Sequence, residues 1–313
     1  MRAVVFGYSN VGDRCLRVLA AAGVELALVV THHDHPGERR WFARVADTAA
    51  ELGAPVVYAE DLASEALAAR VSGVAPDIIF SFYFRAMLPM SLLACARLGA
   101  FNMHGALLPE FRGRAPTNWA VLKGATRTGA TLHRMQAKPD AGAIVDQCAV
   151  PILPDDTARE VFDKVCVAAE LVLWRSLPAL LAGTAPQLPN DITRGSYFGG
   201  RRPEDGRIDW RQPASEVYNL IRAVAPPYPG AFTDLGSRRL IVARARLGGL
   251  RSAPAASASF GADGAPGLRV RDAHILGVCG DGREIDIHEL LYDGRPIDPP
   301  ELARWLRTET ETP

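Results

Sequence analysis

Short apolar runs alternate with amphipathic stretches through the first half of the chain. Segments of helical period separate these runs, which fall at 3–6, 26–30, 56–58 and 77–82. Short buried strands separated by helices are typical of a parallel sheet that is covered on both faces. We therefore predict a Rossmann-like α/β domain, with a mostly parallel sheet flanked by helices at 11–22, 41–52 and 62–71.

The pattern continues to a long amphipathic segment. We expect three more strands, at 99–104, 128–135 and 144–150, where β-branched and apolar residues gather. Asp155-Asp156-Thr157 is a cap signal for a helix over 157–181. The first domain is predicted to span residues 1–183.

After Gly183 the composition changes. Residues 184–206 are rich in Gly and Pro and lack helical period, so we interpret them as a linker. Residues 207–313 hold one helical segment, 214–224, among strand-like pieces at 232–235, 239–245, 268–270, 275–278 and 284–288. Several short strands with turn signals between them predict a small C-terminal β-barrel domain of the OB-like kind. Within it, the low-complexity residues 253–266 are expected to form a loop.

Composition narrows the classes of partner. Lys+Arg and Asp+Glu both number 35 in 313 residues, so the formal net charge is zero, and we expect no nucleic acid partner. No segment approaches the roughly 18 uncharged apolar residues of a membrane helix, so we expect no membrane insertion. Five dispersed cysteines are typical of reduced thiols in a cytoplasmic protein.

Two early motifs have weak interpretations. Gly7 to Gly12 joins the first strand to the first helix, but its two glycines do not complete the dinucleotide fingerprint, which disfavours a nicotinamide-dependent oxidoreductase. The alternative is that Gly7 to Gly12, which includes Asn10, forms a tight turn beside a ligand other than a dinucleotide. His32, His33 and His35 crowd one loop, yet adjacent histidines rarely point the same way, so we expect no metal site.

Asn102 and His104 form the most informative pair. Residues i and i+2 of a strand point to the same face, so both would project together at the carboxyl end of a strand, where open α/β sheets bind ligands. A histidine moves protons near neutral pH, and an asparagine amide can donate to an oxyanion. Asp140, in a downstream loop, could pair with His104 and raise its pKa. On the residues alone, a structural pair and a catalytic site both remain open.

The stretch from Phe101 to Gln147 resembles the signature of folate-dependent formyltransferases. Asn102, His104, the Leu107-Leu108-Pro109 turn, Arg112-Gly113 and Asp140 fall in register with it. The likeness extends over essentially the whole chain. The resemblance is greatest to the branch of the family that formylates UDP-4-amino-4-deoxy-L-arabinose for lipid A modification and polymyxin resistance. Shared sequence motifs such as THHDHPGE, SFYFR and FGGRRP carry this resemblance.

The resemblance implies roles for individual residues. Asn102 would hold an oxyanion, His104 would carry a proton, and Asp140 would orient His104. The co-substrate would be 10-formyltetrahydrofolate, with no metal, in a pocket formed by Ala86, Met87, Leu88, Arg114, Gln136, Ala137, Lys138, Pro139 and Asp140. Asn10 and Arg201 are the candidate contacts to a nucleotide-sugar substrate.

One relative with the same chemistry remains an alternative. A methionyl-tRNA formyltransferase must hold phosphates of a tRNA, and such relatives carry a basic loop after the second strand. Here that loop, residues 32–38, has no Lys or Arg. With the zero net charge, this favours a small nucleotide-sugar substrate. Exposed edges of the predicted barrel would allow the enzyme to form a homodimer.

Overall fold

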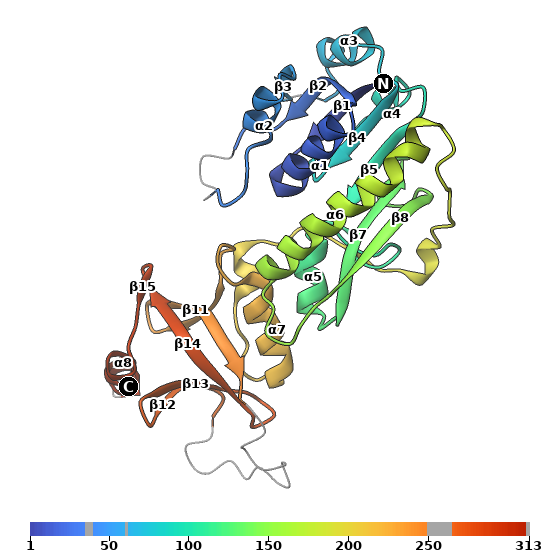
Figure 1. Cartoon of the computed structure of the whole chain (residues 1–313). Coiled ribbons are helices and arrows are strands. Elements are labelled where there is room, and N and C mark those ends of the chain that lie inside the picture. The colour runs from blue at the N-terminus through green and yellow to red at the C-terminus, as the bar shows by residue number, and fades with distance from the viewer. Residues whose placement is uncertain (35–39, 60–61, 249–264, 311–313) are drawn as a thin grey trace. The chain divides into compact units, whose positions relative to one another are not determined.

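The chain divides into two compact units, which are described separately (Figure 1). The structure, a computed structural model, describes residues 1–34, 40–59, 62–248 and 265–310. The first unit comprises 1–117, 127–151 and 161–199, and the second comprises 118–126, 152–160 and 200–313.

A seven-stranded sheet forms the centre of the first unit. Its strands are β1 (Arg2–Gly7), β2 (Glu25–Thr31), β3 (Val56–Tyr58), β4 (Ile78–Phe82), β5 (Ala100–His104), β7 (Arg127–Arg134) and β8 (Ile144–Pro151). The order is β3-β2-β1-β4-β5-β7-β8, and the pairs from β3 to β5 are parallel. The two β7 pairs are antiparallel. The predicted mostly parallel α/β sheet is therefore confirmed.

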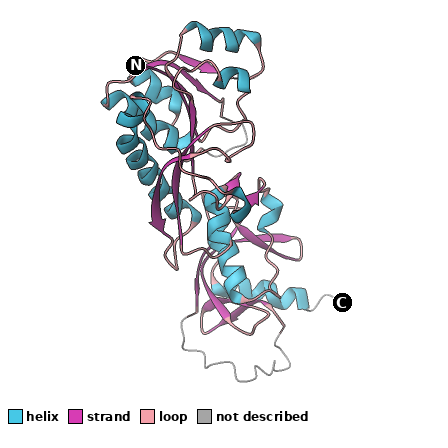
Figure 2. Cartoon of the chain, turned by 90° about the vertical axis from the view of Figure 1, so that its right-hand side faces the viewer, coloured by secondary structure: helices cyan, strands magenta, loops and turns pink. Residues whose placement is uncertain are grey.

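Helices cover both faces of this sheet (Figures 1 and 2). They are α1 (Ser9–Ala21), α2 (Val45–Glu51), α3 (Glu65–Gly73), α4 (Met90–Leu93) and most of α6 (Ala158–Leu181). Alternate strand residues such as Val4, Phe6 and Ile79 share one buried cluster with Leu67 of α3 and Leu92 of α4. Because side chains alternate along a strand, α1 and α2 pack on the opposite face.

Helix α2 is shorter than the predicted segment 41–52. The side-chain Oδ1 of Asn10 accepts a hydrogen bond from the Ala43 N–H at 2.8 Å, and Arg44 is extended, so the helix begins only at Val45. Val45 packs against the start of α1, where a Cβ on Gly12 would come within 2.7 Å of it. The glycine of the early turn is therefore explained by helix packing.

The second unit contains a curled, barrel-like antiparallel sheet. Its strands are β10 (Ala231–Leu235), β11 (Arg238–Leu247), β12 (Gly267–Arg271), β13 (His274–Val278), β14 (Glu284–Tyr292) and β15 (Arg295–Pro296). The order is β10-β11-β14-β13-β12, with β15 beside β14. Irregular register between β11 and β14 bends the sheet. This agrees with the predicted barrel-like domain.

The remaining α-helices of the described residues are α5 (Pro116–Leu122), α7 (Ala214–Val224) and α8 (Pro299–Thr310). Only α7 had been expected. Of the low-complexity loop, residues 253–264 lie outside the described residues. No helix in the described part of the chain is long and apolar enough to span a membrane.

The segment 184–206 contains short ordered elements: η1 (Ile192–Arg194), β9 (Tyr197–Phe198) and η2 (Pro203–Gly206). Strand β9 pairs in parallel with β6 (Arg112–Gly113) of the first unit, to which it belongs. The boundaries 1–183 and 207–313 stay predictions.

Candidate active site

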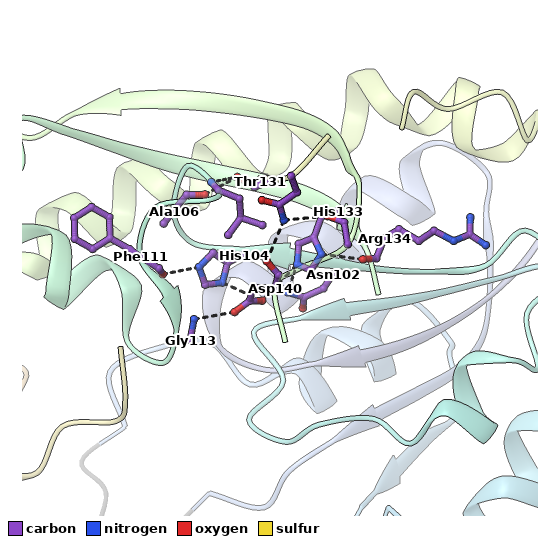
Figure 3. A network of polar contacts seen from close by, with 12 residues as sticks. Asn102, His104, Ala106, Phe111, Gly113, Thr131, His133, Arg134 and Asp140 are labelled. Atoms are coloured by element: carbon purple, nitrogen blue, oxygen red, sulfur yellow. Dashed lines mark hydrogen bonds and ion pairs between the residues drawn. The ribbon is translucent and has the colours of Figure 1, made fainter. Parts of the chain in front are cut away.

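Strand β5 ends in the two polar side chains that the sequence singled out. Asn102 and His104 lie two residues apart on one face of the strand, and His104 is only 5% exposed. Antiparallel β7 runs beside them and places His133 directly opposite Asn102. The Asn102 amide donates to His133 Nε2 at 3.1 Å (Figure 3).

Both nitrogens of His104 face oxygen atoms. Nε2 lies 2.9 Å from the carbonyl oxygen of Phe111, and Nδ1 lies 3.6 Å from Asp140 Oδ1 (Figure 3). Because a carbonyl can only accept, Nε2 carries the proton in the neutral imidazole. Nδ1 is then the nitrogen that can take up a second proton, and that proton would face the carboxylate.

Asp140 comes from the loop between β7 and β8, and several contacts fix it there. Its Oδ2 accepts from the Gly113 N–H at 2.9 Å. The Asn190 amide donates to the backbone oxygens of Asp140 and Gly142, both at 3.0 Å. A Cβ on Gly142 would come within 1.9 Å of the Arg134 oxygen, so this turn of the loop requires glycine. The structure thus brings Asn102, His104 and Asp140 together.

His133 is a member of this cluster that the sequence analysis missed. Its Nδ1–H donates to the Arg134 oxygen at 3.0 Å, which leaves Nε2 as an acceptor between Asn102 and Asp140, 3.5 Å from Asp140 Oδ1. The sequence does contain a signal for His133. It lies in the same family motif as Asn102, in the stretch 101–147, and antiparallel pairing of β5 and β7 makes it the residue that faces Asn102. Its buried imidazole orients the Asn102 amide and leaves the second amide N–H free to donate.

The pKa of His104 depends on burial as well as on Asp140. Burial lowers its pKa, since it removes the imidazolium from water; Asp140 and the Phe111 carbonyl raise it, while His133 and Arg112 lower it further. Asp140 therefore acts in the expected direction, but burial outweighs it, and the pKa of His104 lies below its ordinary value. The imidazole is mostly neutral at pH 7.

The pKa of Asp140 is shifted as well. Burial raises its pKa, but His104, His133 and the Gly113 N–H outweigh burial and hold the pKa of Asp140 well below its ordinary value. The carboxylate is therefore charged at neutral pH, beside a neutral imidazole.

A buried polar network holds the turn that follows His104. The Thr131 hydroxyl donates to the Ala106 oxygen at 2.6 Å and accepts from the Leu108 N–H at 3.1 Å and the Gln147 amide at 2.9 Å. The same Gln147 amide donates to the Leu108 oxygen at 2.9 Å. These contacts fix the backbone that leads from His104 to Phe111.

The residues expected around a folate fall in three segments: 86–88, Arg114 and 136–140. Leu88 is buried in a core cluster of the first unit, and Phe84 and Met135 pack against that cluster. Met87 and Lys138 are exposed beside them. Arg114 is exposed as well, and its N–H donates to the Phe198 oxygen at 3.0 Å. Their contact with folate stays a prediction.

The two candidate substrate contacts have other partners. Asn10 is bound to the Ala43 N–H as described above. Arg201 belongs to the second unit, where its Nη2 donates to the Asp205 oxygen at 2.9 Å and its guanidinium lies 5.0 Å from the Trp119 ring. Burial lowers the pKa of Arg201. Both assignments stay predictions.

The histidines after β2 contact different partners. His32 stacks on Phe84 with 3.9 Å between centroids, and His33 stacks on Tyr58 at 4.0 Å. His35 lies outside the described residues, as do the other residues of 35–39. Over the part of the chain that is described, no group of three or more His, Cys, Asp or Glu side chains could hold a metal ion.

Asn190→Ala is expected to loosen the loop that carries Asp140. The two hydrogen bonds to the loop are worth about 1–3 kcal/mol together, and the free energy of unfolding should fall by that amount in a urea titration. Gln187→Ala, which changes an exposed polar residue of the same segment, is the matched control. Equal stability of the two variants would show that Asn190 does not hold the loop.

An amide donor, a neutral imidazole and a carboxylate around one strand end form an arrangement suited to acyl-type transfer with proton relay. Comparison with known families agrees with this. Residues 1–177 match the family described as formyl transferase, and residues 201–306 match the formyl transferase C-terminal domain. The chain belongs to the formyl transferase family. This formyltransferase combines both family domains, in the order that the sequence predicted.

Solved structures share the fold of this formyltransferase. An N-formyltransferase from Helicobacter canadensis, solved with folinic acid and dTDP-3-aminofucose, has 18% identity and a TM-score of 0.68, covering 91% of this chain and 98% of that one. WlaRD, a sugar 3N-formyl transferase, has 17% identity and a TM-score of 0.70, covering 94% and 98%. A sugar N-formyltransferase from Shewanella has 19% identity and a TM-score of 0.60, covering 74% and 92%.

Proposed function

We propose that the enzyme transfers the formyl group of 10-formyltetrahydrofolate to the 4-amino group of a UDP-amino sugar, namely UDP-4-amino-4-deoxy-L-arabinose. The observation that carries the proposal is the convergence of Asn102, His104 and Asp140 at the buried end of β5. The sequence motifs shared with the lipid A-modifying branch of the family point to this sugar.

The reaction needs one oxyanion donor and one proton carrier. The sugar amine attacks the formyl carbon, a new C–N bond forms, and the formyl oxygen becomes negative. Asn102 has a free amide N–H beyond the one given to His133, and it donates to that oxygen. Collapse breaks the bond between the formyl carbon and the folate N10, which yields a formamido sugar and tetrahydrofolate.

The proton travels from the amine to N10. A neutral His104 is able to accept it, and the low pKa that burial imposes keeps His104 in this form at pH 7. The charged Asp140 beside Nδ1 stabilises the transient imidazolium. No net proton is consumed, since the one lost by the amine ends on the folate nitrogen.

Support for the folate and nucleotide-sugar classes comes from relatives of the same fold. The Helicobacter canadensis enzyme was solved with folinic acid and dTDP-3-aminofucose, and WlaRD with dTDP and 5-N-formyl-THF. For this chain we place folate against Ala86–Leu88, Arg114 and 136–140. Asn10 and Arg201 stay the proposed nucleotide contacts.

A formylation assay tests the proposal. The purified enzyme is incubated with 10-formyltetrahydrofolate and, in separate reactions, UDP-4-amino-4-deoxy-L-arabinose, other 4-amino and 3-amino sugar nucleotides, and methionyl-tRNA. We expect turnover to be fastest with the UDP-4-amino-pentose. Preferred turnover of methionyl-tRNA would replace the proposal by the tRNA alternative, and preferred turnover of a dTDP-3-amino sugar would change the sugar.

A further inference from the structure

Helix α6 carries a row of apolar side chains on its solvent-exposed side. Val167, Leu171 and Trp174 are 46%, 50% and 55% exposed, and Pro178 is exposed in line with them. We call these four residues the α6 stripe. All four belong to the first unit, so the stripe lies within one compact body. Figure 1 shows α6 running along one face of the sheet of that unit.

The opposite side of α6 already contributes to the core of the first unit. Val165, Val172, Leu173 and Leu177 are buried there. Single apolar residues on a protein surface are ordinary, but a helix that is apolar on two sides needs a neighbour on each of them. Packing within the chain covers only one of the two sides of α6. The α6 stripe therefore indicates a second neighbour.

The spacing of the α6 stripe indicates the shape of that neighbour. Its members follow one another at intervals of four, three and four residues. This alternation keeps the side chains in a narrow seam with a period of 3.5 residues, which is typical of a helix that packs along one other helix. At 1.5 Å per residue the seam is about 16 Å long. We therefore expect the neighbour to be a helix of similar length.

Opposite charges border the α6 stripe on its two flanks. At 3.6 residues per turn, Asp163 and Glu170 lie on one side of the stripe and Arg175 lies on the other. Glu170 accepts from Arg14 Nε of α1 at 2.6 Å. Arg175 Nη2 donates to Asp146 of β8 at 2.8 Å. The apolar seam therefore has a charged rim, which is the usual layout of a protein–protein interface.

The two flanks are complementary to a second copy of the same helix. When two copies lie parallel about a two-fold axis that runs along the seam, the acidic flank of each faces the basic flank of the other. Glu170 of one copy then lies opposite Arg175 of the second copy, which extends the two ion pairs into a chain of alternating charges. In an antiparallel pair, like flanks would face each other, and the repulsion between like charges disfavours that arrangement.

We propose that the α6 stripe is the interface of a homodimer, in which the α6 helices of two copies of this chain pack in parallel about a two-fold axis. Each position of the seam then contacts the same position of the second copy, and Trp174 supplies the large aromatic anchor that such interfaces favour. This contact lies on the first unit, and not on the barrel edges that the sequence suggested. The inference goes beyond the proposed function, and it does not depend on which sugar is formylated.

Sedimentation velocity of the full chain, at concentrations from about 1 to about 200 µM, measures this association. One pair of helices buries less area than a standard interface, so we expect a dissociation constant in the micromolar range. The average mass should rise with concentration from that of one chain towards that of two. A chain that stays monomeric over the whole range would overturn the proposal.

Leu171→Glu and Leu171→Lys should each weaken the dimer more than about 100-fold, because two like charges would meet in the centre of the seam. Leu171 is half-exposed, so both variants should keep the fold, which circular dichroism checks. Leu153→Glu makes the same change at a leucine that is 53% exposed and lies outside the stripe, and it should dimerise as the unchanged chain does. A dimer that persists in Leu171→Glu would locate the contact on another surface and overturn the proposal.

Mixing the variants tests the parallel arrangement. An equimolar mixture of Leu171→Glu and Leu171→Lys should form a dimer at least about tenfold tighter than either variant alone, because opposite charges then face each other. The pair Val167→Glu and Val167→Lys should behave in the same way. In an antiparallel dimer at most one position can meet itself, so recovery at both positions supports the proposal, and recovery at one or neither overturns the parallel packing. Formylation is not measured in these experiments, so their outcome is independent of the proposed reaction.

Discussion

His104→Gln is expected to lower kcat about 10²- to 10⁴-fold, the usual contribution of a general acid–base group. Glutamine can still donate to the Phe111 oxygen, so the backbone around the site should keep its shape, but it cannot take up a proton beside Asp140. Formyl transfer is measured in single-turnover experiments with saturating co-substrates. Affinity for folinic acid, measured separately, should change less than threefold.

His274→Gln serves as the matched control, since it removes an exposed imidazole of the second unit to which no catalytic role is assigned. The unchanged enzyme should show kcat/KM rising with pH and then levelling off, because only neutral His104 accepts the proton from the amine. The pKa of His104 is lowered, so this rise should lie below pH 6.5. Turnover of His104→Gln within threefold of normal would remove the proposed proton carrier.

Asp140→Asn is expected to have the second-largest effect, a fall in kcat of about 10²-fold or more. The variant keeps the shape of the side chain but removes the charge that stabilises the imidazolium of His104. Without that anion the pKa of His104 falls further, so the rising limb of the pH profile should move to lower pH while the plateau drops. The measurement is kcat/KM between pH 5 and pH 9.

Asp272→Asn, in an exposed turn of the second unit, is the control for loss of one carboxylate. A purely structural Asp140 would lower the fraction of active enzyme without moving the limb. A limb that stays in place would therefore contradict the electrostatic role, whatever the loss of rate.

Much of the site could be predicted because strand geometry is regular. The period of two along 99–104 placed Asn102 and His104 on one face, and the carboxyl end of a buried strand is where this class of sheet binds ligands. The residues alone suggest Asp140 as a partner of His104, and the family motif supports it, but the contact itself depends on how the loop between β7 and β8 closes. His133 could not be found in this way, because the sequence predicts both strands but not the register in which β5 and β7 pair.

Other features depend on tertiary contacts that no local pattern shows. The segment 41–44 has helical period, yet its Ala43 N–H donates to the Asn10 side chain, and the helix begins only at Val45. The sign of the His104 pKa shift follows from burial, which outweighs the carboxylate that the sequence suggested. Short elements such as α5 and β9 have too few residues for a periodic signal to appear.

The hydrogen bonds from Asn190 to the Asp140 loop have a consequence for truncated forms of the protein. A fragment that ends at residue 183 would contain all three residues that we propose as catalytic, Asn102, His104 and Asp140, and would therefore look sufficient. It would nevertheless lack Asn190, which clamps the loop, and β9, the neighbour of the strand that bears Arg112. Such a shortened polypeptide should therefore be a poor catalyst, and a minimal active version must run on to at least residue 199.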